Sequence, residues 1–353
     1  MSTYINAIGN ISPQKTADNH HFLEEPVSYE GSQLRSIDPG YKEFIPPDLI
    51  RRMSRIIRMG IAASKICLKE AGCAVPDAII TGTGLGCLED TEKFLGTLIR
   101  NNEEFLTPTS FIQSTHNTVG GQIALLLKCH GFNFAYVHRG ISFESALIHA
   151  MMRIENGDSK NVLTGGVDEL TTPSFEIMQR MGFWKRKPMP SLQLFHDTTR
   201  GTIAGEGAAF FFLEKEKTAN SYAVLKGVET LFDPAGSEEI SAWISRFLAQ
   251  YGLKPADISL LIPGMNGDPK QDRIYHELID TRFAGIPLAC YKHLCGEYMT
   301  ASAFGTWLGA MILKYGSVPD VVAMNEPPRS LDHILVWNHY RQTHHSLILL
   351  SRV

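Results

Sequence analysis

The chain has 353 residues, 44% of them hydrophobic and 20% charged, which is the composition of an ordinary globular protein with room for one large core or two fused halves. Its 33 basic and 37 acidic side chains give a formal net charge of −4, which creates no field that would attract nucleic acid. The six cysteines have no metal-ligand spacing, the apolar runs are too short to span a membrane, and residues 1–5 lack the features of a signal peptide, so we expect a cytoplasmic protein with neither a metal site nor a cofactor.

Strands and helices alternate in the first part of the chain. Residues 4–9 predict a strand, and the polar segment 14–48 has no clear period and is expected at the surface. Residues 47–72 predict one long helix, because apolar side chains recur along one stripe and Gly72 supplies a C-terminal stop. Small residues in the strand expected over 78–84 indicate close packing, since the spacing of a dinucleotide-binding loop is absent.

A strand, helix, strand unit follows, of the kind that builds a parallel sheet. A β-rich run at residues 133–137 leads into a tight turn and a helix that Gly157 closes, and a second strand is expected over 160–167. The turn at residues 137–142 has the form of a nucleophile elbow, yet no cysteine stands in it. The central question about function is what occupies this elbow.

Two related α/β halves are indicated by the order of the elements. Residues 200–214 predict two neighbouring strands joined through glycines, and a charged stretch beginning at Glu214 marks a junction. Strands and helices then resume in a similar rhythm up to residue 353. We therefore expect an N-terminal half over residues 1–215, which contains the elbow, and a C-terminal half over residues 222–353.

Several motifs, in their order along the chain, resemble those of the β-ketoacyl synthases of the thiolase-like superfamily. They are an arginine-rich helix opening at residues 51–55, a strand end at 165–169, and a glycine-glutamate-glycine motif at 205–209. The segment at 108–122 is similar to variants from aryl-polyene and flexirubin pigment clusters. The resemblance implies an α/β thiolase-like fold whose two halves form a five-layered αβαβα architecture.

The catalytic positions of that family carry other residues here. The resemblance places the family's nucleophilic cysteine on Gly140 and its two histidines on Gly264 and Glu297, so only the motif lysine, Lys292, remains. Two bulky polar residues also stand where a glycine-rich oxyanion loop would lie, within residues 339–344. Condensation needs a thiolate, groups that stabilise an enolate, and oxyanion donors. The sequence therefore predicts a pseudo-enzyme.

The implied role is that of a non-catalytic subunit, similar to a chain length factor, in a β-ketoacyl-acyl-carrier-protein synthase heterodimer. Its partners would be a catalytic ketosynthase subunit and an acyl carrier protein. The side chains expected at the shared acyl tunnel or interface are Phe111, Thr115, His116, Arg139 and Tyr340. An aromatic beside three cations would suit an acidic carrier protein, or form only a solvated loop; these residues are Trp184, Lys185, Arg186 and Lys187.

Two other functions stay open at this point. One is an acyltransferase or hydrolase acting on acyl thioesters with Ser142 as nucleophile, and the other is a homodimeric acyl-binding scaffold. A capping or packing role is favoured for Ser142 and Ser145, and a buried inert thiol at a helix start for Cys295. The adjacent His344 and His345 are expected on opposite faces of a strand, so they are not expected to act as a pair.

Overall fold

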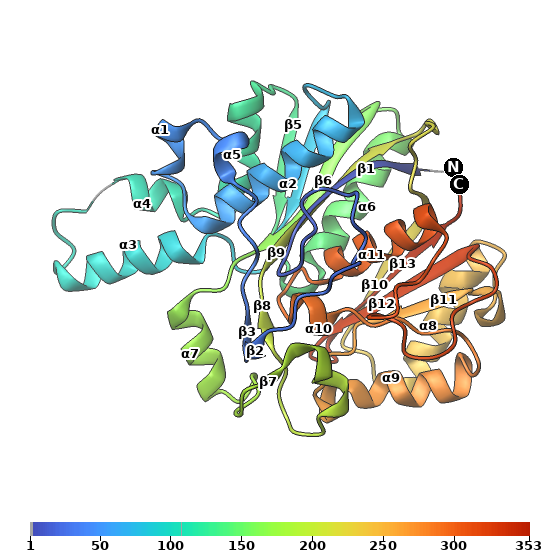
Figure 1. Cartoon of the computed structure of the whole chain (residues 1–353). Coiled ribbons are helices and arrows are strands. Elements are labelled where there is room, and N and C mark those ends of the chain that lie inside the picture. The colour runs from blue at the N-terminus through green and yellow to red at the C-terminus, as the bar shows by residue number, and fades with distance from the viewer. Residues whose placement is uncertain (1–2, 107) are drawn as a thin grey trace.

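The computed structural model describes residues 3–106 and 108–353 (Figure 1). Met1 and Ser2, which belong to the N-terminal stretch considered above, lie outside this description. A nine-stranded sheet with the order β11-β12-β13-β10-β1-β9-β6-β4-β5 runs through the molecule. Its strands are β1 (Thr3–Ile11), β4 (Ala78–Gly82), β5 (Phe132–Tyr136), β6 (Asn161–Asp168), β9 (Gly207–Glu214), β10 (Ala223–Phe232), β11 (Leu260–Pro263), β12 (His333–Tyr340) and β13 (His344–Ser351).

Helices and small strand pairs surround this sheet. The helices are α1 (Pro47–Ile50), α2 (Arg55–Ala71), α3 (Leu88–Arg100), α4 (Pro108–Gln113), α5 (Thr118–Leu127), α6 (Ser142–Glu155), α7 (Thr172–Arg180), α8 (Ser237–Gln250), α9 (Pro269–Arg282), α10 (Lys292–Cys295) and α11 (Ser302–Tyr315). Short 3-10 helices are η1 (Tyr41–Glu43), η2 (Arg139–Ile141), η3 (Ser191–His196) and η4 (Pro255–Asp257). The small pairs are β2 (Glu30–Gly31) with β7 (Met189–Pro190), and β3 (Gln33–Leu34) with β8 (Ala204–Gly205).

The sheet has two half-sheets, β5-β4-β6-β9-β1 and β10-β13-β12-β11. Side chains alternate between the two sides along each strand, so each half-sheet has two apolar faces. On β9, Phe210 and Phe212 point into a core beneath α2 and α5, while Phe211 points the other way into a central core. On β13, Leu349 points into a third core under α8 and α9, and Leu350 points into the central core. Every buried strand must therefore be covered on both sides.

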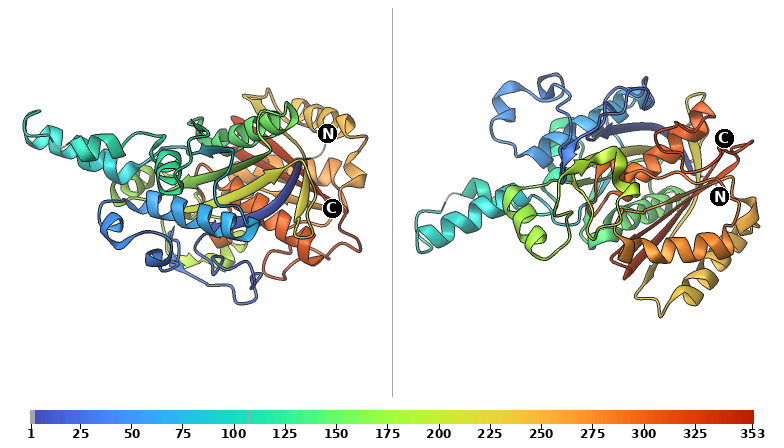
Figure 2. Two further views of the ribbon diagram at one scale, coloured as in Figure 1. Left: turned by 90° about the horizontal axis from the view of Figure 1, so that it is seen from above. Right: turned by 60° about the horizontal axis from the view of Figure 1, so that its bottom comes forward.

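The layers follow from these three cores. The central core holds α6 and α11 between the two half-sheets, and the outer cores are closed by α2 with α5 and by α8 with α9. Figures 1 and 2 show the resulting succession of helices and sheets. This is the αβαβα layering that the sequence motifs imply.

The half-sheets are joined where β1 pairs antiparallel with β10, with Thr3 opposite Leu225 and Ile5 opposite Ala223. The predicted junction at residues 214–221 begins at the last residue of β9 and leads to β10, and these two strands stand on either side of β1. The division into two halves at this junction stays a prediction.

The strand, helix, strand unit at the elbow is present as β5, α6 and β6, as predicted. The small residues of β4 are explained by packing. A Cβ atom on Gly82 would lie 2.5 Å from the carbonyl oxygen of Ser142, so the end of β4 touches the start of α6 directly. Close packing, and not a ligand, is the reason for this glycine.

The predicted single helix over residues 47–72 is wrong, because the chain leaves the helix between α1 and α2. Ser54 is extended, with φ −66° and ψ 169°. The next residue, Arg55, donates from Nε to the buried carboxylate of Glu206 at 2.7 Å and from Nη2 to the carbonyl of Ser36 at 2.7 Å. These bonds to distant segments fix where α2 begins, and no local period can reveal them.

The segment 14–48 is not simply surface structure. Phe22, Leu23 and Leu34 are buried, and the Gln14 amide donates to the carbonyls of Val27 and Leu294. Although the segment is mostly polar, a few of its apolar side chains are buried at the edge of the core.

Two findings concern the described residues as a set. Within residues 3–106 and 108–353, no helix combines the length and apolar character needed to cross a membrane. In the same part of the chain, no three His, Cys, Asp or Glu side chains are grouped as metal ligands.

The carboxylate of Glu206 is expected to be a main determinant of stability. It is fully buried and binds the side chains of Arg55 and Arg35, so Glu206→Gln leaves a partly buried guanidinium without its counter-ion. We expect a loss of about 3 kcal/mol of unfolding free energy, measured by urea denaturation. Glu25→Gln, which removes an exposed ion pair with Lys15, is the control and should leave the midpoint unchanged. Equal midpoints for the two variants would contradict this account.

Candidate functional site

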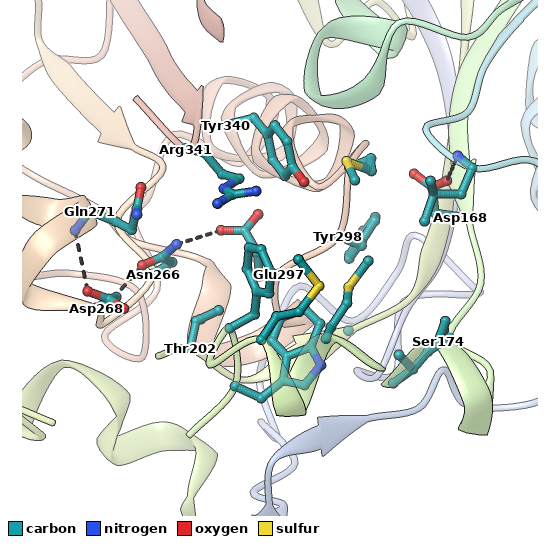
Figure 3. Close-up of a pocket in the computed structure, with 18 of the residues that line it drawn as sticks. Asp168, Ser174, Thr202, Asn266, Asp268, Gln271, Glu297, Tyr298, Tyr340 and Arg341 are labelled. Carbon is teal, nitrogen blue, oxygen red and sulfur yellow. Dashed lines mark hydrogen bonds between the residues drawn. The ribbon is translucent and has the colours of Figure 1, made fainter. Parts of the chain in front are cut away.

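A cavity of about 240 Å³ opens where α7, the start of α9 and the tip of the β12–β13 hairpin meet (Figure 3). Its lining includes Glu297, Asn266, Tyr340 and Arg341, so it lies at the positions that the sequence motifs single out. Gly140, Gly264 and Lys292 lie beneath its walls and not in the lining. The cavity is therefore the candidate functional site.

Tyr340 occupies the space above the elbow. A Cβ atom on Gly140 would lie 2.2 Å from the Cβ of Tyr340 and 2.6 Å from its Cγ. Tyr340 is the last residue of β12, so the hairpin places it rigidly on η2. Arg139, the residue before Gly140, has a φ of +49°, which lies in the left-handed region that few non-glycine residues adopt. Two of the predicted tunnel residues, Arg139 and Tyr340, thus meet at the elbow.

Gly264 is enclosed in a similar way. A Cβ atom there would lie 2.1 Å from Oδ1 of Asn338 and 2.9 Å from the hydroxyl of Tyr275. The Tyr275 hydroxyl accepts a hydrogen bond from the backbone N–H of His339 at 2.8 Å, which holds the ring in place. Side chains from β12 and α9 therefore fill the position where the family's histidine is expected.

Glu297 and Lys292 form a buried ion pair. The Lys292 ammonium donates to the two carboxylate oxygens of Glu297 at 2.9 and 2.7 Å, and the lysine side chain has no exposure to solvent. Asn266 donates to the same carboxylate at 2.8 Å (Figure 3). The cation that Glu297 binds is thus the motif lysine five residues earlier, and the carboxylate faces the cavity with its charge neutralised.

The loop that carries Asn266 is held by a second carboxylate. Asp272 accepts from the backbone N–H groups of Asn266 and Gly267 at 2.9 and 2.7 Å. Burial raises the pKa of Asp272 to about 6, although these two N–H groups and Lys292 oppose the shift. Neither Asp272 nor Tyr275 was a candidate in the sequence, because both belong to an otherwise ordinary amphipathic helix.

The hairpin tip adopts the backbone of a glycine turn without glycine. Arg341 and Gln342 have φ +55° and +59°. Gln342 compensates with specific bonds, since its side-chain amide donates to the carbonyl of Lys270 at 2.7 Å and its backbone N–H donates to Nδ1 of His339 at 3.3 Å. Burial and nearby cations hold the pKa of His339 well below its usual range, which keeps Nδ1 free to accept.

Comparison with known proteins assigns the family. A family model described as the β-ketoacyl synthase N-terminal domain matches residues 6–219, which is more than half of the chain. The chain belongs to the β-ketoacyl synthase family. One relative, 3-oxoacyl-acyl-carrier-protein synthase 2 of Synechocystis, is 20% identical over 332 residues, covering 86% of this chain and 79% of that protein.

Solved structures of ketosynthases share the fold over the full length. The ishigamide ketosynthase/chain length factor superimposes with a TM-score of 0.78 at 17% identity, covering 100% of this chain and 99% of that one. The ketosynthase ApeO in complex with its chain length factor ApeC from Xenorhabdus doucetiae gives 0.79 at 16% identity, covering 100% and 98%. The thiolase-like ketosynthase fold expected from the sequence is confirmed.

The remaining tunnel candidates of this ketosynthase-family chain are not among the residues that line the cavity. Phe111 is on α4, and Thr115 and His116 are in the turn after it; all three are exposed. The His116 ring lies against Gly86, since a Cβ atom on that glycine would be 2.8 Å from it. The structure therefore separates these three residues from Arg139 and Tyr340.

The exposure expected for Trp184 and Lys185 is wrong. The Lys185 side chain is only 1% exposed, because its ammonium donates to Asp197 at 2.7 Å and to the carbonyls of Thr199 and Gly267 at 2.6 and 2.9 Å. Trp184 is buried and stacks on Phe175. Only Arg186 and Lys187 of this group are exposed.

Ser142 and Ser145 bind backbone groups, as a packing role requires, but neither caps the helix. Ser142 Oγ accepts from the N–H of His138 and donates to the carbonyl of Arg139, both at 2.7 Å, and Ser145 donates to the carbonyl of Ile141. The N-cap residue of α6 is Ile141, which has no side-chain cap bond. No imidazole hydrogen-bonds to Ser142 Oγ in the described part of the chain.

Cys295 ends the short helix α10, so the prediction that it begins a helix is wrong. Its thiol is buried, as predicted, and burial raises its pKa well above the usual range. It therefore lacks the thiolate character that a reactive cysteine needs.

Gly140→Ala is expected to destabilise the protein, because the new methyl group overlaps the Cβ of Tyr340 and neither atom can rotate away. The expected cost is about 2 kcal/mol of unfolding free energy. Gly121→Ala is the matched control: this helical glycine has open space around its Cβ position, and alanine there should stabilise by up to about 1 kcal/mol. Introducing Tyr340→Gly should cancel most of the penalty of Gly140→Ala in a double-mutant cycle, and purely additive effects would refute the contact.

Glu169, in the cavity wall, is expected to make stability depend on pH. Burial raises the pKa of this carboxyl from about 4.5 to about 8, so the folded state holds a proton that the unfolded chain releases. The resulting stabilisation is complete below about pH 4.5 and is lost as pH rises towards 8. Glu169→Gln should flatten the fall of unfolding free energy over this window, by at most about 1.4 kcal/mol per pH unit. Glu176→Gln, on the exposed side of α7, should keep the wild-type slope; a wild-type slope in Glu169→Gln would overturn the assignment.

Proposed function

We propose that this protein is the non-catalytic, chain-length-factor-like subunit of a β-ketoacyl-acyl-carrier-protein synthase heterodimer. The observation that carries the proposal is the contact between Tyr340 and Gly140. Covalent condensation starts with attack of a thiolate on an acyl thioester at the elbow. Here the elbow has no side chain, and the volume that one would need is filled by Tyr340.

The environment of Glu297 also supports a non-catalytic role. Ketosynthases use two histidines to stabilise the enolate that forms when a malonyl group loses its carboxylate. Here Glu297 and Lys292 form an ion pair at one of these positions, so the position offers neither an imidazole nor a free positive charge to stabilise the malonyl carboxylate or the enolate. At the other position, Asn338 and Tyr275 leave no room for an imidazole.

An exposed sheet edge supports the assembly with a partner. β5 is the last strand of the sheet, so its outer N–H and carbonyl groups are available for pairing with another chain. Phe132, Phe134 and Tyr136 form a ladder of neighbouring rings on this strand, and Phe134 is 45% exposed. A hydrophobic edge of this kind favours a stable dimer over a monomer.

Helices α3 and α4 project from the body of the molecule (Figures 1 and 2). Ile99 on α3 and Phe111 on α4 are 72% and 56% accessible, and Phe105, in the segment after α3, is 86% accessible. In the proposed heterodimer, Phe111, Thr115 and His116 would line the acyl tunnel of the catalytic partner and limit the length of its product. The two ketosynthase–chain length factor structures of similar fold support this arrangement.

The carrier protein and the pathway complete the proposal. Arg186 and Lys187 are the exposed cations of the predicted docking group and would contact an acidic acyl carrier protein. The segment 108–122 supports an aryl-polyene or flexirubin type of product, made in the cytoplasm. The alternative of a Ser142 nucleophile has no such support, because its hydroxyl is buried and bonded to the backbone.

The proposal predicts that this chain takes no acyl group while its partner does. The chain is co-expressed with candidate ketosynthases, incubated with acyl-acyl-carrier protein, and examined by intact-mass spectrometry and light scattering. We expect a one-to-one heterodimer with the adduct on the partner alone. A stable adduct on Ser142 or any other residue of this chain would establish the rival enzyme, and a homodimer indifferent to every ketosynthase would establish the scaffold.

A substitution in β5 tests whether this strand forms the heterodimer interface. Phe134→Arg places a charge in the ring ladder of β5 and should weaken the heterodimer at least tenfold. Phe232→Arg is the matched control, because that phenylalanine is 66% exposed on β10, away from the edge strand. If both variants associate like the wild type, β5 is not the contact surface.

A further inference from the structure

The cavity has two walls of opposite chemistry. One wall is apolar and comes from α7 and the segments beside it, with Leu170, Met178, Met181 and Phe183 among its side chains. The other wall is polar and comes from the start of α9 and the hairpin tip, with Asn266, Gln271 and Arg341 (Figure 3). A cavity with one wall of each kind fits an amphiphile better than a purely polar or purely apolar molecule.

The four acidic side chains of the cavity already have hydrogen-bond partners. Glu169 accepts from the N–H groups of Ile56 and Glu89. Asp168 accepts five hydrogen bonds, from Thr83, Gly84, Leu85 and Thr300. Asp268 accepts from the N–H of Gly201 at 2.6 Å and from the first N–H groups of α9. Glu297 is bound by Lys292 and Asn266. None of these carboxylates is left to attract a cationic ligand.

The cations at the rim are not satisfied. Arg341, Arg200 and Lys270 line the cavity, and none of them forms an ion pair with any side chain of residues 3–106 or 108–353. The Arg341 guanidinium lies 4.5 Å from the centroid of the Phe183 ring, at the boundary between the polar and the apolar wall. Since Glu297 already has Lys292 as its counter-ion, Arg341 has no counter-ion among the described residues.

We propose that this cavity binds a free medium-chain carboxylic acid without forming a covalent bond. The carboxylate would be held by Arg341, whose planar guanidinium matches two oxygens, and the alkyl tail would lie against Met178, Met181 and Phe183. A volume of about 240 Å³ equals that of roughly eight water molecules and suits a ligand on the order of ten non-hydrogen atoms. The inference rests on the proposed function in one respect, that no residue of this chain is acylated by the ligand.

A phosphopantetheine arm fits this cavity less well. Its amide groups would need hydrogen-bonding partners along the tail. On the α7 side of the cavity the lining offers only the Ser174 hydroxyl for this, and that hydroxyl already bonds to Thr171. An alkyl tail needs no such partners. The wall chemistry therefore favours the free acid over a carrier-bound arm.

Isothermal titration of the full-length protein with octanoate tests the proposal. We expect saturable one-to-one binding that weakens as ionic strength rises. Octanol, which lacks the carboxylate, and butyrate, which lacks most of the alkyl tail, should each bind at least tenfold more weakly. Arg341→Gln should weaken octanoate binding about tenfold or more and leave octanol unaffected. Met178→Trp, which fills the apolar side, should abolish binding of both.

Arg180→Gln is the matched control, since this exposed arginine lies at the end of α7, beside the cavity but not in its lining. The absence of octanoate binding, equal affinity for octanol, or equal losses in the two arginine variants would each overturn the proposal. So would tight binding of pantetheine 4′-phosphate in place of octanoate. Thermal unfolding of every variant checks that it is folded.

Mass spectrometry on the same samples separates this proposal from the proposed function. Binding of octanoate without an adduct supports both. A covalent adduct after incubation with octanoyl-acyl-carrier protein would refute the non-catalytic role, while reversible, Arg341-dependent binding of the free acid would still stand.

Discussion

The buried carboxylate of Asp168 is the contact on which the site depends. It stands at the end of β6 and binds the loop after β4 with one oxygen, Oδ1, and Thr300, just before α11, with the other. One side chain thus ties the N-terminal half-sheet to the helix that fills the central layer. Burial raises its pKa, and its five donors offset that effect. Moving this carboxylate would displace the cavity wall and the central core together.

Other buried polar side chains near the cavity also bind segments that are distant in the sequence. Glu169 accepts from the backbone of α2 and from the start of α3, and Glu206 collects Arg55, Ser36 and the N–H of Leu170. On the other side of the cavity, Lys185 fixes the Gly267 loop. Buried carboxyl groups and the Lys185 ammonium therefore position the loops around the cavity, and the apolar cores position the strands and helices behind them. Each of these polar groups is costly to bury without hydrogen bonds, and each has at least two partners.

The sequence predicted the parts of this structure that depend on local periodicity. The elbow unit, the buried strand β9 and the layered fold all follow from runs of apolar residues and from glycines that end them. The other strand expected after Arg200 is reduced to β8, which pairs with β3 and not with β9. The break between α1 and α2 could not be predicted, because it depends on Arg55 reaching Glu206, 151 positions later in the chain. The burial of Lys185 has the same origin, since Gly267 and Asp197 have no sequence signal that points to it. At the site, the sequence singled out Gly140, Glu297 and Tyr340, but not the side chains of Asn338 and Tyr275 that enclose Gly264.

The packing of Tyr340 on Gly140 also bears on how such a chain can evolve. A mutation that places a cysteine at the elbow meets the tyrosine before it meets any substrate, so it carries a folding penalty and no benefit. Removing the tyrosine first opens a gap at the hairpin tip, which again brings no benefit by itself. Each single substitution is therefore disfavoured by folding stability, although the two together are compatible. This epistasis couples the two positions: while Tyr340 packs on Gly140, a side chain of any kind at position 140 is disfavoured, whereas positions on the surface can vary freely.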